Sequence, residues 1–218
     1  MNCCHSTYCS ASDGMFNARI ARGSLERYRK EGPDRTTRLL VDSLVQNGRA
    51  DGALLDIGGG IGALSIELLG AGIQRSTLVD ASPSYLAAAR EEVARRGLEE
   101  RLEILHADFT RAAEVLPPTD VVVMNRVVCC FPDLDLLLNL ALEHTRKYLA
   151  LSYPRERWYT KAAITALNAY QVITRNPFRV FVHPEARMRA IFAQNSFRQV
   201  SQTGTLEWSV EVWERESA

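Results

Sequence analysis

The sequence carries no net charge, because its 218 residues include 26 Lys and Arg and 26 Asp and Glu. A balanced chain lacks the basic surplus that is typical of proteins binding nucleic acid or anionic membranes, so neither is expected as a partner. It contains no apolar run of the roughly 18 residues that a membrane span needs, and no basic start followed by an apolar stretch. We therefore expect a cytoplasmic protein.

Cysteine is scarce as well, with five residues in two clusters: Cys3, Cys4 and Cys9, then Cys129 and Cys130. An odd number in this arrangement is not a disulfide framework and indicates reduced thiols. The first cluster, which includes His5, matches no zinc-binding spacing, so no metal is expected. If the two clusters met in space, they would form a thiol trap for a soft ligand such as a metalloid.

The composition is that of a folded domain, with 46% apolar and 24% charged residues. The length predicts one domain with a small appendage. Residues 1–50 are interpreted as an N-terminal arm and a helical lid, with two short helices between Ser24 and Gln46 that break at Gly32–Asp34. Residues 51–218 form the main domain, with a helical insertion at about 155–183.

Strands and helices alternate through the main domain. Strands are predicted over 53–57, 76–80, 101–106, 120–124 and 148–153, and helices over 61–69, 85–96 and 133–146. Two further helices, over 158–174 and 184–195, precede two closing strands over 197–200 and 205–213, joined at Gly204. Repeated strand–helix units predict a doubly wound α/β fold, a parallel sheet with helices on both faces.

A glycine-rich loop, Gly58 to Gly62, follows the first of these strands. Its spacing satisfies a dinucleotide fingerprint, and Asp80 lies where such enzymes hold a ribose hydroxyl. Asp56, however, lies close to where a pyrophosphate would bind, and like charges about 4 Å apart repel by ~4 kcal/mol. The carboxylate suits a cationic ligand better, and S-adenosylmethionine carries an ammonium and a sulfonium.

Four motifs in order carry a resemblance to a known family: Asp56-x-Gly58-x-Gly60-x-Gly62, Asp80-Ala81-Ser82-Pro83, Ala107-Asp108-Phe109, and Asp120 to Asn125. Over about residues 50–154 the chain resembles class I S-adenosylmethionine-dependent methyltransferases, and more distantly magnesium-protoporphyrin O-methyltransferases. The resemblance implies a Rossmann-like, mostly parallel seven-stranded sheet with an antiparallel last strand. It also implies methyl transfer from S-adenosylmethionine, with S-adenosylhomocysteine as the product.

The expected cofactor-binding residues follow from these motifs: Asp56, Gly58, Gly59, Gly60, Gly62, Asp80, Ala81, Ser82, Asp108, Phe109 and Asn125. Asp80 would chelate the ribose diol, and Asp108 with Phe109 would contact the adenine. A nicotinamide-binding oxidoreductase and a non-catalytic module that kept the donor pocket remain the alternatives.

The acceptor is expected to be a small, anionic molecule. Eight basic and two acidic residues lie between Arg155 and Arg198, an excess of six positive charges that indicates either an acidic acceptor or a solvated helix face. Candidate substrate-binding residues are Tyr28, Arg126, Cys129 and Arg155. Candidate catalytic residues are Asn125, Tyr153 and His183.

Overall fold

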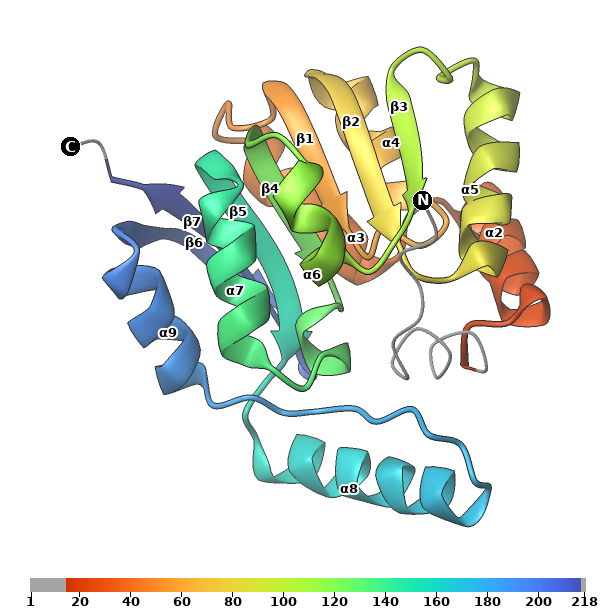
Figure 1. Ribbon diagram of the computed structural model, residues 1–218, viewed down its shortest axis with the longest axis vertical. Helices are drawn as coiled ribbons and strands as arrows, with labels where there is room; N and C mark the ends of the chain where they lie inside the picture. The colour runs from red at the N-terminus through yellow and green to blue at the C-terminus, as the bar shows by residue number, and fades with distance from the viewer. Residues whose placement is uncertain (1–14, 217–218) are drawn as a thin grey trace.

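The computed structural model describes residues 15–216 (Figure 1). The cysteines and the histidine of the first cluster lie outside this range. The strands are β1 (Gly52–Ile57), β2 (Ile73–Asp80), β3 (Leu102–His106), β4 (Thr119–Asn125), β5 (Thr145–Pro154), β6 (Phe197–Gly204) and β7 (Trp208–Arg215). The helices are α2 (Ala18–Glu31), α3 (Arg35–Val45), α4 (Ala63–Ala71), α5 (Pro83–Arg96), α6 (Phe109–Ala112), α7 (Leu134–Glu143), α8 (Trp158–Ile173) and α9 (Glu185–Gln194), with short 3₁₀ turns η1 (Ala113–Val115) and η2 (Val128–Cys130).

All seven strands form one sheet in the order β3-β2-β1-β4-β5-β7-β6. The pairs from β3 through to β5 are parallel, whereas β7 is inserted between β5 and β6 and runs antiparallel to both. The predicted fold, a doubly wound seven-stranded sheet with an antiparallel last strand, is therefore confirmed.

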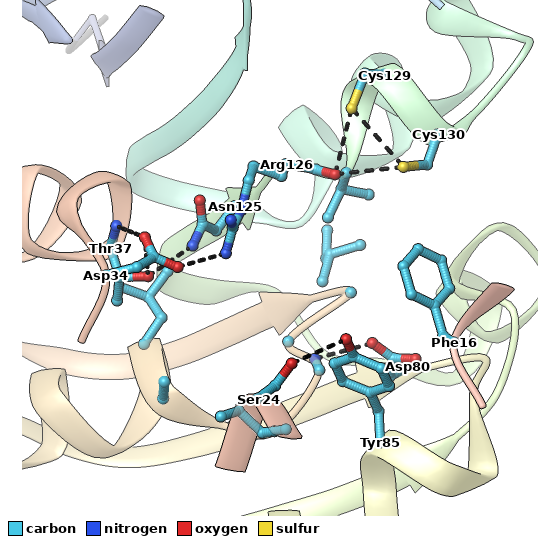
Figure 2. A pocket seen from close by; sticks show the side chains of 18 of the residues that line it. Phe16, Ser24, Asp34, Thr37, Asp80, Tyr85, Asn125, Arg126, Cys129 and Cys130 are labelled. Carbon is cyan, nitrogen blue, oxygen red and sulfur yellow. Dashed lines mark hydrogen bonds and ion pairs between the residues drawn. The ribbon is translucent and has the colours of Figure 1, made fainter. Parts of the chain in front are cut away.

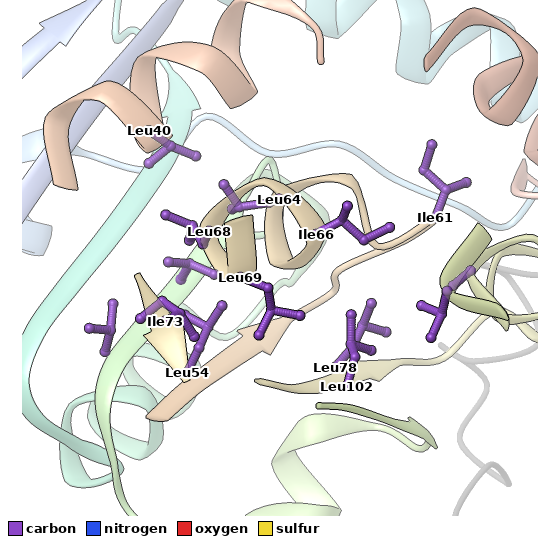
Figure 3. Close-up of a cluster of buried hydrophobic side chains, with 14 of the residues drawn as sticks. Leu40, Leu54, Ile61, Leu64, Ile66, Leu68, Leu69, Ile73, Leu78 and Leu102 are labelled. Atoms are coloured by element: carbon purple, nitrogen blue, oxygen red, sulfur yellow. The ribbon is translucent and has the colours of Figure 1, made fainter. Parts of the chain in front are cut away.

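Helices cover both faces of the sheet because successive residues of a buried strand point to opposite sides. In β4, Val121 and Val123 join the core beneath α2, α3, α4 and α5, while Val122 and Met124 join the core beneath α6, α7 and α9. Figure 3 shows part of the first core, where Leu40 of α3 and Leu64 of α4 approach the strand residue Leu54. The described part of the predicted lid thus shares its core with the main domain.

Several boundaries differ from the prediction. The first helix begins at Ala18, before the expected Ser24, because the Asn17 side chain accepts hydrogen bonds from the Arg19 and Ile20 amides and caps it. The helix expected to reach residue 146 ends at Glu143, and β5 begins at Thr145. Strand β6 continues to Gly204, where its hairpin with β7 turns.

The predicted insertion after β5 contains α8, which projects from the sheet layers below the ends of β4 and β5 in Figure 1. Among residues 15–216, no helix has the length and apolar character needed to cross a membrane.

Candidate active site

A cavity of about 860 Å³ opens at the carboxyl ends of the parallel strands. Ligands in doubly wound sheets bind at this edge, and the volume lies within the range of small-molecule sites. Its walls come from the glycine loop, the ends of β2 and β4, the α2–α3 turn, η2 and the inner side of α8. Figure 2 shows Asp80 and Tyr85 on one side of the cavity and Arg126 with the two cysteines on another.

The glycine loop brings bare backbone to the cavity. Gly58 has φ +65°, and a Cβ atom there would lie 2.5 Å from a Val127 methyl group. Gly60 has φ +57°, and its Cβ would lie 3.0 Å from the Tyr85 ring. Only glycine satisfies both the left-handed backbone and the close approach. The loop therefore presents peptide groups at Gly58, Gly59 and Gly60 to a ligand.

Asp56 lies beneath this loop and is fully buried, yet it lines the cavity. Its Oδ2 accepts a hydrogen bond from Ser65 Oγ at 2.7 Å, while Oδ1 has no partner within the part of the chain that the structure describes. Burial, and secondarily the nearby Asp80 charge, raise the pKa of Asp56 to about 7, against the lowering effect of Ser65. A buried acceptor without a partner is costly, so this site favours a ligand that brings a donor or a positive charge.

Asp80 closes the end of β2 and is held by the loop itself. Its Oδ2 accepts from the Gly60 amide at 2.9 Å, and its Oδ1 accepts from the Ser82 amide at 2.8 Å. Burial raises the pKa of Asp80, and the two backbone hydrogen bonds oppose that shift. The carboxylate is thus fixed in orientation at the cavity wall.

The other predicted cofactor residues divide into two groups. Gly59, Ala81, Asp108 and Phe109 line the cavity, although the Phe109 ring is mostly buried and packs edge-on against His144. Gly62 and Ser82 do not line it. Gly62 precedes α4 in a left-handed conformation, and Ser82 caps α5 through the Tyr85 amide, so both position the walls instead.

Asn125 and Arg126, at the end of β4, are tied to the start of α3. Asn125 Nδ2 donates to Thr37 Oγ1 at 2.9 Å, and Asn125 Oδ1 accepts from Ser152 Oγ at 2.7 Å. Arg126, which has φ +61°, forms a 2.6 Å ion pair with Asp34. Both residues line the cavity, and both side chains of the ion pair are nearly half exposed. Asp34 and Thr37 could not be predicted from the sequence, because their partners lie about 90 residues away.

The two predicted bases are turned away from the cavity. Tyr153 is 3% exposed and donates to Glu211 Oε1 at 2.7 Å, and burial with this partner raises the pKa of its hydroxyl. His183 Nε2 lies 3.1 Å from the Val128 carbonyl oxygen and 3.0 Å from that of Phe131, so it donates there and fastens the segment after α8 to η2. Neither residue lines the cavity, which corrects the prediction that they act on the acceptor.

Arg155, a candidate substrate-binding residue, does not line the cavity either. Its Nε donates to the carbonyl oxygens of Thr205 and Trp208, so the side chain fastens the β6–β7 hairpin to the end of β5. All eight basic residues between 155 and 198 are described, and none lines the cavity. Lys161, Arg187, Arg189 and Arg198 instead form ion pairs with carboxylates. The local charge excess is therefore a property of the surface and not of the cavity.

Tyr28 and Cys129, two of the candidate substrate-binding residues, line the cavity. The Tyr28 hydroxyl, however, donates to Glu67 Oε1 at 2.6 Å, and burial with this bond raises its pKa. Its ring, not its hydroxyl, is available as a wall. The apolar wall made by Phe16, Ile164 and Phe178 was not predicted, because this wall depends on contacts between segments that are distant in the chain.

Part of the chain is similar in sequence to known methyltransferases. Residues 55–150 match the model of the methyltransferase domain family. The chain is 37% identical over 112 residues to the ribosomal protein L11 methyltransferase of Yersinia pseudotuberculosis, covering 51% of this chain and 36% of the relative. It is 33% identical over 93 residues to the enzyme of the same name from Psychrobacter arcticus. The chain thus spans about a third of the length of these curated relatives.

Solved structures match over nearly the whole chain. Magnesium protoporphyrin IX methyltransferase from Synechocystis PCC 6803, with bound S-adenosylhomocysteine, has a TM-score of 0.74 at 20% identity and covers 96% of this chain and 100% of its own. An O-methyltransferase family protein from Burkholderia thailandensis has a TM-score of 0.70 at 16% identity, covering 94% and 63%. The strand order and the glycine loop define a Rossmann-like class of fold. Within it, the chain is similar to S-adenosylmethionine-dependent methyltransferases, in sequence over residues 55–150 and in fold over nearly its whole length.

Proposed function

We propose that this protein is a cytoplasmic enzyme that transfers a methyl group from S-adenosylmethionine to a small molecule with an apolar body and an acidic group. The observation that carries the proposal is the arrangement of one cavity: a fixed carboxylate, Asp80, at the glycine loop, and a guanidinium, Arg126, at the end of β4. S-adenosylmethionine supplies an electrophilic methyl group on sulfur. The chain supplies binding, orientation and exclusion of water.

On the donor side, Asp80 would accept hydrogen bonds from the ribose, and Asp56 would face the ammonium end. Asp108 and Phe109 line the part of the cavity after β3 and would contact the adenine. Strand order favours this donor over a nicotinamide dinucleotide, because dinucleotide folds have the order 3-2-1-4-5-6 without an antiparallel insertion. With a pKa of about 7, Asp56 is only partly charged, so its repulsion of a pyrophosphate is a weaker reason.

On the acceptor side, the wall between α8 and Phe16 is apolar, which suits an apolar body. Arg126 can exchange its exposed partner Asp34 for an acidic group of the acceptor. An acceptor that is already ionised needs no general base, which agrees with the positions of Tyr153 and His183 away from the cavity. Asn125 lies between the donor and acceptor sides of the cavity. Its hydrogen bonds to Thr37 and Ser152 would position the start of α3 against the ends of β4 and β5.

A protein acceptor is the second candidate, because the curated relatives are named as methyltransferases of a ribosomal protein. The apolar wall of the cavity favours the small molecule. A screen with S-adenosylmethionine labelled in the methyl group would compare carboxylate-, phenol- and thiol-bearing metabolites with ribosomal protein and with RNA. We expect label in a carboxylate-bearing small molecule, and label only in protein or RNA would overturn the proposal.

The variant Arg126→Gln tests the acidic group of the acceptor. Loss of a charge-assisted hydrogen bond costs about 1.5–3 kcal/mol, so kcat/KM should fall about 10- to 100-fold. Arg187→Gln is the matched control, because Arg187 is similarly exposed and paired with Asp135 but lies outside the cavity. Equal kcat/KM for the two variants would exclude Arg126 from acceptor binding.

A further inference from the structure

Two adjacent cysteines, Cys129 and Cys130, line the acceptor side of the cavity. Their sulfur atoms lie 3.7 Å apart, and each Sγ lies 3.5 Å from the carbonyl oxygen of Arg126 (Figure 2). The left-handed backbone of Arg126 and the 3₁₀ turn η2 place both sulfurs beside this one oxygen. The pair is thus a preformed vicinal dithiol, and the methyl transfer proposed above does not use it.

The pair is poorly suited to an internal disulfide. Adjacent Cα atoms are about 3.8 Å apart across a trans peptide, whereas disulfides usually join Cα atoms about 4.4–6.8 Å apart. Both cysteines are free in this structure, and the chain has no cis peptide bond among the described residues. A bridge through a third atom avoids this strain, because the two sulfurs, 3.7 Å apart, then need not approach the about 2.05 Å of a disulfide bond.

The two thiols differ in acidity. The hydrogen bond between the two thiols and the nearby Arg126 charge lower the pKa of Cys130, whereas this hydrogen bond and burial raise the pKa of Cys129. Cys130 is partly exposed to the cavity, whereas Cys129 is 3% exposed. Reactive cysteines are found in such electropositive, partly accessible surroundings.

The number of ligands decides which centre the pair can hold. Within residues 15–216, no group of three or more His, Cys, Asp or Glu side chains is arranged to bind a metal ion. A structural zinc ion needs four ligands and would lack two of them. A trivalent metalloid centre needs three bonds and can keep its own substituent in the third position.

We propose that Cys129 and Cys130 form a binding site for a thiophilic trivalent metalloid centre, held by two sulfur bonds at the acceptor side of the cavity. With an arsenic(III) oxide reagent, two S–H bonds and the arsenic–oxygen bond break, and two arsenic–sulfur bonds form. The oxide leaves with both protons as water, and no atom changes oxidation state. The organic substituent of the reagent would lie against the apolar wall made by Phe16 and Phe178.

Phenylarsine oxide is the probe, and the full chain is the test protein. The cysteines of the first cluster would also react, so a parent variant carries Cys3→Ser, Cys4→Ser and Cys9→Ser. Intact-mass spectrometry should find one phenylarsenic group per parent chain, with the loss of one water. Cys130→Ser, added to the parent, should lower the affinity about 10²- to 10⁴-fold, because the second bond is then no longer intramolecular.

Two further binding measurements, with S-adenosylhomocysteine and with zinc, complete the test. S-adenosylhomocysteine should bind the parent and Cys130→Ser equally, which shows that the variant is folded and separates this site from the proposed function. Zinc should bind the parent much more weakly than the arsenical. Unchanged arsenical affinity in Cys130→Ser, or tighter binding of zinc than of the arsenical, would overturn the proposal.

Discussion

Asp80 is the residue on which donor binding depends most. Both of its carboxylate oxygens are fixed by backbone amides of the loop and of the α5 cap, so the group is oriented before any ligand arrives. Asp80→Asn keeps the shape but loses the charge, and the affinity for S-adenosylhomocysteine should fall about 10- to 100-fold. Isothermal titration calorimetry measures it, with Asp135→Asn, an exposed aspartate outside the cavity, as the control. An unchanged affinity in Asp80→Asn would refute the placement of the ribose.

The raised pKa of Asp56 predicts that donor binding depends on pH. Its pKa is raised from its ordinary value to about 7, so the neutral acid dominates below pH 7 and the carboxylate above it. A cationic donor binds the carboxylate, so the affinity for S-adenosylmethionine should rise about ten-fold between pH 6 and pH 8. The free energy of unfolding of the unliganded protein should show the opposite trend. Because the pKa of Asp56 is higher in the folded than in the unfolded chain, its protonation stabilises the fold, and this stability is lost as pH rises through 7.

The variant Asp56→Asn is the control for this pH profile, since it cannot ionise. Its affinity for S-adenosylmethionine should be flat between pH 6 and pH 8, measured by the same titration. A ten-fold rise in the variant as well would assign the pH dependence to another group.

Local motifs made the donor side of the site predictable from sequence. Asp56 is the penultimate and Asp80 the last residue of a predicted strand, and Asp108 follows the next strand. These strand ends share one edge of a parallel sheet. Tyr153 and Arg155 were misplaced because their partners, Glu211 and the hairpin carbonyls, lie 50 or more residues away. No spacing rule in a single sequence reports such contacts.

At the scale of elements, one buried glutamate fastens the predicted lid helix to the domain. Glu92 of α5 is fully buried and accepts hydrogen bonds from Arg29 of α2 and from Arg95 and Arg96 of its own helix. These arginines lower the pKa of Glu92 to about 2. Helical periodicity predicted α5 well, but a glutamate in a charged run gave no signal that it lies buried.

Glu92→Gln should lower the free energy of unfolding by about 2 kcal/mol at pH 7, because the charge-assisted hydrogen bonds from three arginines are lost. The folded pKa lies below the ordinary value near 4.5, so this stability is present above pH 4.5 and lost as pH falls toward 2. The difference between wild type and Glu92→Gln in urea unfolding should therefore shrink between pH 5 and pH 3. Glu91→Gln, which removes the two ion pairs of a more exposed glutamate with Arg22 and Arg29, is the control and should change little.

Element boundaries were predictable where a capping residue stood beside the periodic run. Ser82 and Pro83 fixed the start of α5, and Gly97 fixed its end. The start of α2 was missed, because the residues before Leu25 have little apolar periodicity and only the Asn17 cap marks the helix.

For the whole molecule, the alternation of strands and helices was enough to predict the doubly wound sheet and, with the family motifs, its antiparallel last strand. The cavity was less predictable. Its acceptor side combines the α2–α3 turn, η2 and α8, which are brought together only by the folded sheet. The zero net charge of the chain also did not predict how the charges are distributed. The surface after β5 is basic, whereas the cavity carries charges of both signs.

The most direct measurement is a calorimetric titration of the full chain with S-adenosylhomocysteine, with NADH titrated in parallel. A cavity built for this donor should bind S-adenosylhomocysteine one to one, with a dissociation constant of about 10 μM or lower, and give no heat with NADH. No binding of S-adenosylhomocysteine at several hundred micromolar, or saturable binding of NADH, would contradict the account.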